Sequence, residues 1–128
     1  MTSVLISCSM KKYEEAVRIA DELRMLGCDV ATPEIGRTDA SKREHIDTHF
    51  EKLKDSDVLL VGNFTDQPDD HYGRVGASTF FEAGWAYALN KRVYHVNPLD
   101  PTSVYTEDIA AITCGDMQQL VKDLKEKS

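Results

Sequence analysis

The sequence predicts a flavodoxin-like α/β domain: a doubly wound, five-stranded parallel sheet in the order 2-1-3-4-5, covered by helices on both faces in three layers α/β/α. Short runs rich in β-branched residues alternate with segments whose apolar residues recur at helical spacing. Right-handed crossovers between parallel strands place each helix against the sheet. The 128 residues suffice for one core, so we expect residues 1–128 to form a single domain.

The first elements follow from these patterns. A strand is expected over residues 3–8, and a helix over 11–26 has apolar residues at helical spacing. Gly27 supplies the stop of this helix. A second strand over 28–32 ends at Pro33. A polar loop then leads to the next helix.

The middle of the chain repeats the alternation. A helix is expected near 41–54, because Ser41 and Glu44 have the spacing of a capping box and an apolar stripe follows them. Residues 57–62 form a buried strand, since every position from Val58 to Val61 is apolar.

The last part of the chain opens on the stretch GASTFFEAGWAYALNKRV, residues 76–93. Its body predicts a helix so apolar that we expect it to be largely buried. Strands follow at 92–96 and, briefly, around 111–114. A final helix begins at Asp116.

The composition favours a small-molecule partner. The chain is 41% hydrophobic and 29% charged, and its net charge of −7 disfavours a nucleic acid polymer or an anionic membrane surface as a partner. No apolar run approaches the length of a membrane span, and the N-terminal residues lack a signal-peptide pattern, so we expect a cytoplasmic protein. Cys8, Cys28 and Cys114 form no CxxC pair and are expected to be reduced structural thiols.

Ligands of such folds bind beyond the carboxyl ends of the strands. That rule selects residues 7–10, the long segment 63–77, and 97–98. The segment NFTDQPDDHYGRVGA exceeds the usual length of a loop between strand and helix, which is typical of functional loops. The candidate substrate-binding residues at this edge are Ser7, Cys8, Ser9, Asn63, Asp70, Gly76, Ser78 and Asn97.

Several other chemistries are disfavoured. No arginine closes a phosphate loop after Cys8, and GxGxxG is absent. His45 and His49 have the spacing of a metal pair, but the glutamate of HExxH is missing and no third ligand follows. We therefore expect neither a metal nor a cofactor.

Glu82 is the single charge between Phe80 and Leu89, and it has two interpretations. Thr79 and Glu82 have the T-x-x-E spacing of a capping box, with Thr79 at the N-cap, which needs no ligand. Alternatively, the helix starts at the carboxyl edge of the sheet, so Glu82 borders the predicted cleft and serves chemistry. The spacing leaves both open.

The arrangement of VLISCSM, DVLLVGN and YGRVGASTFFEAGWAYALNKRVYHVNP resembles the nucleoside 2-deoxyribosyltransferase family, which includes nucleoside 5′-monophosphate N-glycosidases. The resemblance covers most of the chain. Its most specific element is E-x-G-x-A-x-A followed by G/N-K and a strand, matched by Glu82, Gly84, Ala86, Ala88, Asn90, Lys91 and Val93.

The resemblance implies that Glu82 is a nucleophile attacking C1′ of a nucleoside or nucleotide, in a transferase or an N-hydrolase that forms a homodimer with its sites near the interface. The chain departs from the family where a tyrosine is replaced by Leu5-Ile6, an aspartate by His49, and an acid by Gly76. These departures favour the alternative, a nonenzymatic module that binds a nucleotide or a nucleotide-derived signal. Cleavage of NAD in the manner of TIR domains fits the local pattern less well.

Two further site assignments stay open. His49 lies beside an apolar stripe, so it is either a semi-buried structural histidine or a ligand to a sugar hydroxyl or phosphate. Asp69, Asp70 and His71 are either proton donors to a leaving base or a solvated turn.

Overall fold

The computed structural model describes residues 1–33 and 41–126. The polar loop predicted after Pro33 therefore lies mostly outside the described residues. In chain order the elements are β1 (Ser3–Ser7), a 3-10 turn η1 (Met10–Lys12), α1 (Tyr13–Met25), β2 (Asp29–Ala31), α2 (Lys42–Lys54), β3 (Val58–Val61), α3 (Ala77–Ala88), β4 (Arg92–His95), α4 (Val104–Ile112) and α5 (Met117–Glu126). Among the described helices, none has the length and apolar character needed to cross a membrane.

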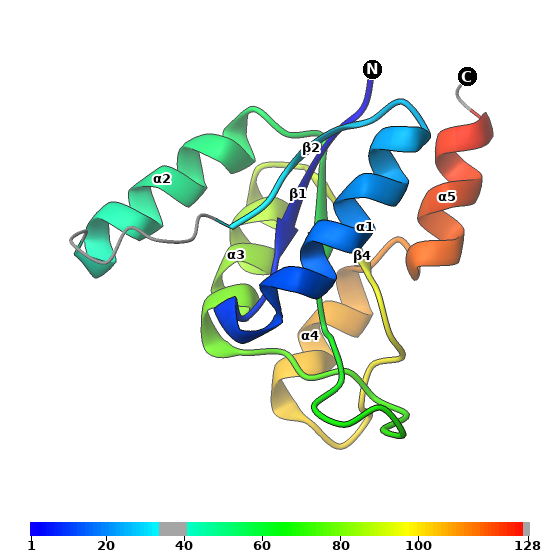
Figure 1. The fold of residues 1–128 in the computed structure, drawn as a ribbon. Helices are drawn as coiled ribbons and strands as arrows, with labels where there is room; N and C mark the ends of the chain where they lie inside the picture. The colour runs from blue at the N-terminus through cyan, green and yellow to red at the C-terminus, as the bar shows by residue number, and fades with distance from the viewer. Residues whose placement is uncertain (34–40, 127–128) are drawn as a thin grey trace.

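The centre of the fold is a parallel sheet of four strands in the order β2-β1-β3-β4 (Figure 1). The register pairs Leu5 with Leu59 between β1 and β3, and Leu59 with Val93 between β3 and β4. The neighbours of the two central strands are therefore as the sequence predicted. All four strands end at the same edge, where the predicted cleft lies.

The prediction of a fifth strand was wrong. The segment after α4 runs along β4 through two backbone hydrogen bonds, from Cys114 N to Val93 O at 2.7 Å and from His95 N to Gly115 O at 3.1 Å. It makes only an isolated bridge, between His95 and Asp116. Helix α4 extends to Ile112, so it includes the first two residues of the expected strand at 111–114, and α5 begins at Met117 directly after the bridge.

Helices cover both faces of the sheet, as predicted. On one face, Val4, Ile6 and Leu60 pack against α1 and α5, in a cluster that includes Leu23 and Leu120. On the other face, the alternate strand residues pack against α2, α3 and α4; the buried members of this second cluster are Leu5, Leu53, Leu59, Val61, Val75, Ala83, Ala86, Val93 and Ile109. The period of two along each strand accounts for the two separate clusters.

Helix α3 is buried on one face rather than all round, in contrast to the sequence prediction. Its buried residues are Thr79, Glu82, Ala83 and Ala86. Tyr87 is 62% exposed. Packing one side of a helix on a sheet leaves the other side uncovered in a single chain, however apolar that side is.

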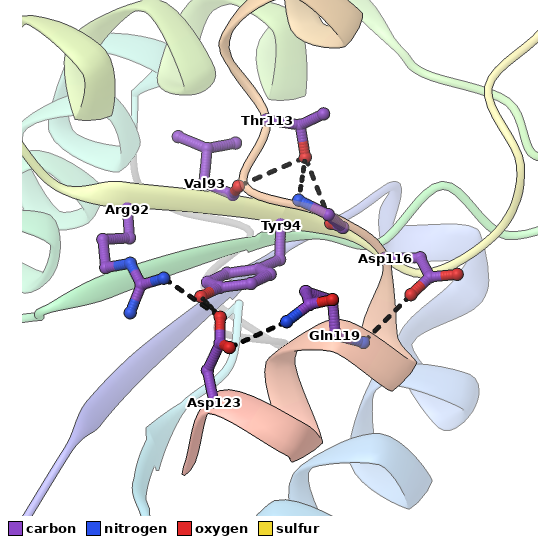
Figure 2. A network of polar contacts seen from close by, with 8 residues as sticks. Arg92, Val93, Tyr94, Thr113, Asp116, Gln119 and Asp123 are labelled. Carbon is purple, nitrogen blue, oxygen red and sulfur yellow. Dashed lines mark hydrogen bonds and ion pairs between the residues drawn. The ribbon is translucent and has the colours of Figure 1, made fainter. Parts of the chain in front are cut away.

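Hydrogen bonds to one carboxylate fasten α5 to β4 (Figure 2). Oδ2 of Asp123 accepts from the hydroxyl of Tyr94 at 2.5 Å and from Nη2 of Arg92 at 3.0 Å. Oδ1 accepts from Nε2 of Gln119 at 2.8 Å. These hydrogen bonds, that of Tyr94 foremost, hold the pKa of the Asp123 carboxyl below its usual range.

Candidate active site

The helix that carries Glu82 begins earlier than the capping-box interpretation requires. The N-cap of α3 is Gly76, which makes no side-chain capping bond, and Thr79 lies inside the helix. The prediction of a Thr79–Glu82 capping box was therefore wrong. Glu82 falls in the second turn, where its side chain points toward β1 and α2.

Both carboxylate oxygens of Glu82 are engaged. The hydroxyl of Ser7, at the carboxyl end of β1, donates to Oε2. Nδ1 of His49, on α2, lies 2.5 Å from Oε1. The Glu82 side chain is 12% exposed. The fold thus brings together three of the predicted site residues from different elements.

The donors of this cluster can be assigned from their protons. A carboxylate only accepts, so the single proton of the Ser7 hydroxyl goes to Glu82. Thr79 Oγ1 lies 3.1 Å from Ser7 Oγ and therefore donates to it. His49 carries a proton on Nδ1 for the same reason. Two donors thus compensate the burial of the carboxylate.

Contacts at the start of helix α2 and in its second half hold in place the helix that carries His49. The capping box of Ser41 and Glu44 is confirmed, with Glu44 N to Ser41 Oγ at 3.1 Å. Directly after His49 in the sequence, the ring of Phe50 packs edge to face on Trp85 of α3 at 5.0 Å between centroids. Nearer the cleft, Nζ of Lys42 donates to Ser78 Oγ at 3.2 Å.

Cys8 follows Ser7 and borders the same cluster. Burial, reinforced by the charges of Glu15 and Glu82, raises the pKa of the Cys8 thiol to about 11. The thiol is therefore protonated near neutral pH, which fits no nucleophilic role. Ser9, the next candidate, caps the turn η1 by accepting from Lys11 N.

The chain is similar in fold to several solved structures over most of its length. A conserved protein from Enterococcus faecalis matches with a TM-score of 0.73 at 16% identity, covering 100% of this chain and 99% of that chain. The CMP N-glycosidase BcmB of Clostridium botulinum matches with a TM-score of 0.59 at 16% identity, over 97% and 98% of the two chains. A 2-deoxyribosyltransferase of Bacillus psychrosaccharolyticus matches with a TM-score of 0.65 at 18% identity, over 91% and 85%.

The chain has the 2-deoxyribosyltransferase and N-glycosidase fold. No family model matches the sequence, and no curated protein matches it. At these identities the similarity is one of fold.

Within this deoxyribosyltransferase-like fold, Asn63 and Asn97 bind each other rather than the cleft. Oδ1 of Asn63 accepts from the backbone of Val96 and Asn97, both at 2.9 Å, and its Nδ2 donates to Asn97 O at 2.7 Å. Nδ2 of Asn97 in turn donates a hydrogen bond to Asn63 O at 3.0 Å. The two amides thus join the ends of β3 and β4, and the side-chain oxygen of Asn63 is engaged within the protein.

The remaining candidates lie away from Glu82. Asp70 is exposed at the tip of the long loop, where its Oδ2 accepts from Gln67 N at 3.0 Å, beside the exposed Asp69 and His71. Gly76 lines a hollow of about 480 Å³ between the long loop and the start of α4, and Glu82 is not among its lining residues. In the part of the chain that the structure describes, no group of His, Cys, Asp and Glu side chains could hold a metal ion.

Two site residues were missed by the sequence analysis. Thr79 was assigned only a capping role, although it orders the hydroxyl of Ser7. No sequence pattern indicated Lys42, because it is an ordinary residue in the first turn of α2. Its contact with Ser78 joins positions far apart in the chain and is visible only in the folded structure.

Proposed function

We propose that this protein is an N-glycosyl-bond enzyme in which Glu82 is the nucleophile that attacks C1′ of a nucleoside or nucleotide. The observation that carries the proposal is a buried carboxylate at the carboxyl edge of the sheet, oriented by donors from two other elements. The shared fold supports it, since that fold includes a CMP N-glycosidase and a 2-deoxyribosyltransferase.

The reaction would proceed in two displacements. A Glu82 oxygen bonds to C1′ through an oxocarbenium-like transition state, while the electron pair of the C1′–N bond leaves with the base. Water or a second base then attacks C1′ and returns the electron pair to Glu82. Attack by water gives hydrolysis, and attack by a second base gives glycosyl transfer.

The hydrogen bonds around Glu82 fit this role. His49 keeps Oε1 in place, and Oε2 becomes free to attack when the Ser7 hydroxyl rotates from Glu82 to Thr79, which lies within hydrogen-bond distance. We propose that the 5′ end of the substrate lies toward Ser9, Ser78 and Lys42, because Lys42 brings a positive charge beside the start of α3. Asp69, Asp70 and His71 stay the proposed donors to the leaving base, although they lie in the exposed part of the long loop, away from Glu82.

The alternative is a nonenzymatic nucleotide-binding module. One observation favours it: Glu82 is already satisfied by Ser7 and His49 without any ligand, as a purely structural carboxylate would be. In that case the cleft would bind a nucleotide without cleaving it.

We further propose that the protein acts as a homodimer in the cytoplasm. Phe81 and Tyr87 on α3 and Val104 on α4 are apolar and exposed, and a symmetric pair of chains would cover them. The three cysteines are free, as is usual for cytosolic proteins.

A screen for base release tests the proposal. Ribo- and deoxyribonucleosides, their 5′-monophosphates and NAD are incubated with the protein, with and without an acceptor base, and free base is measured chromatographically. We expect release from at least one nucleoside or nucleotide. If the protein binds a nucleotide but cleaves none of these compounds, the binding module replaces the enzyme.

A further inference from the structure

His49 presents a second nitrogen that the Glu82 contact does not use. Because Nδ1 faces Glu82, Nε2 is the ring nitrogen left for another partner, as an acceptor in the neutral ring or as a donor in the charged ring. Within residues 1–33 and 41–126, Nε2 makes no hydrogen bond. The side chain is 18% exposed, so part of the ring is open to solvent.

The stereochemistry of the reaction places His49 on a defined face of the sugar. In a β-nucleoside the base lies on one face of the furanose ring, and the 2′ and 3′ hydroxyls lie on the other. Glu82 must approach C1′ from the face opposite the departing base. His49, bonded to the other oxygen of the same carboxylate, therefore lies on the hydroxyl-bearing face.

The 2′ hydroxyl is the nearer of the two hydroxyls to that position. Its carbon, C2′, is bonded directly to C1′, whereas C3′ is one carbon farther from the point of attack. A group held against the attacking carboxylate thus meets the 2′ position first.

We propose that His49 is a specificity-determining residue whose Nε2 forms a hydrogen bond with the substrate 2′ hydroxyl, so that the protein prefers ribonucleotides to 2′-deoxyribonucleotides. This inference rests on the proposed function, since it assumes attack by Glu82 at C1′. A 2′-deoxy substrate leaves Nε2 without its partner. Loss of one such hydrogen bond corresponds to a preference of about three- to tenfold.

Two substitutions at the same position separate the two ring nitrogens. In His49→Asn, the side-chain amide can replace the Nδ1 donor to Glu82, but nothing replaces Nε2. In His49→Gln, the longer amide can reach the position of Nε2, but the donor to Glu82 is lost. His45→Asn, one turn earlier on α2, is the matched control.

The measurement is kcat/KM for base release from the common ribonucleoside 5′-monophosphates and from their 2′-deoxy counterparts. We expect the wild type to favour the ribo substrates. His49→Asn should lose this preference. His49→Gln should lower kcat/KM for both kinds of substrate and keep the preference for ribose. His45→Asn should keep the wild-type ratio. An equal rate for both sugars in the wild type, or an unchanged ratio in His49→Asn, would overturn the inference.

Calorimetric binding of the same ribo and deoxy monophosphates separates this inference from the proposed function. Tighter ribo binding that disappears in His49→Asn, without base release by the wild type, would support sugar recognition by His49 and refute the enzyme. Equal binding of both sugars without base release would refute both.

Discussion

The Cys8 thiol provides a test at the scale of a single residue. With a pKa of about 11, only about one Cys8 in a thousand is a thiolate at pH 8, and its side chain is half-buried. Cys114 is exposed. We expect iodoacetamide to label Cys114 at least about a hundredfold faster than Cys8, as followed by peptide mass spectrometry. Comparable labelling of Cys8 in the folded protein would show that its thiol is open to solvent or has a pKa well below 11.

At the same scale, residue patterns predicted the importance of Glu82 but not its environment. Spacing alone gave Thr79 and Glu82 a capping role, because the T-x-x-E pattern does not reveal that α3 starts at Gly76. The contacts of Ser7 and His49 with Glu82 join positions far apart in the chain, so only the folded sheet edge brings them together.

The loop after β3 provides a test at the scale of an element. A Cβ on Gly73 would lie 1.6 Å from the carbonyl oxygen of Asn63. This oxygen belongs to the backbone, so it cannot move aside as a flexible side chain could. We expect Gly73→Ala to destabilise the fold by more than about 2 kcal/mol in urea titration, because it forces the Asn63–Asn97 pair apart.

Gly84→Ala is the matched control for this loop substitution. No atom lies within 4 Å of the added Cβ, and the residue sits inside α3. It should stabilise the protein by about 0.5–1 kcal/mol, since alanine is the better helix former. If both alanine variants behaved alike, the close approach at Gly73 would be contradicted.

The attachment of α5 to β4 gives a pH-dependent prediction. Tyr94→Phe removes the hydroxyl that lowers the pKa of Asp123, so the variant should unfold at a lower temperature near neutral pH. A carboxyl with a lowered folded-state pKa stabilises above its ordinary value of 3.8, and this contribution is lost as the pH falls through the lowered value. The difference in unfolding temperature between the variant and the wild type should therefore become smaller below about pH 4 in thermal melts. A gap that is constant down to pH 2 would mean that Asp123 is not the partner of the hydroxyl.

Among the elements, those with a clear period were predicted and one was not. The strands from β1 to β4 and the helix α2 with its cap follow from local pattern. Helix α4 was missed, and its last residues were assigned to a strand. Its β-branched residues favour a strand locally, whereas burial of Ile109 against α3 and the cap at Ser103 favour the helix.

For the whole molecule, the exposed apolar face of α3 and α4 predicts a dimer. Phe81 is 46% exposed and Val104 is 73% exposed, beside a hollow of about 380 Å³ between the two helices. We expect sedimentation at micromolar concentration to show a dimer and Tyr87→Lys to shift it to monomer. Met25→Lys, at a still more exposed position on the opposite side of the sheet, should leave the dimer intact. A wild type that is monomeric throughout this range would refute the prediction.

The order of the strands was predictable because parallel crossovers admit few topologies, and the site edge follows from that order. The chemistry that we propose at this edge depends on one bond, between Glu82 and C1′. Intact-protein mass spectrometry after acid quenching during turnover measures it most directly. We expect an added glycosyl mass that maps to Glu82 and is absent in Glu82→Gln, which should release base at least about a thousandfold more slowly. Base release by Glu82→Gln at the wild-type rate, or an adduct on another residue, would refute nucleophilic attack by Glu82.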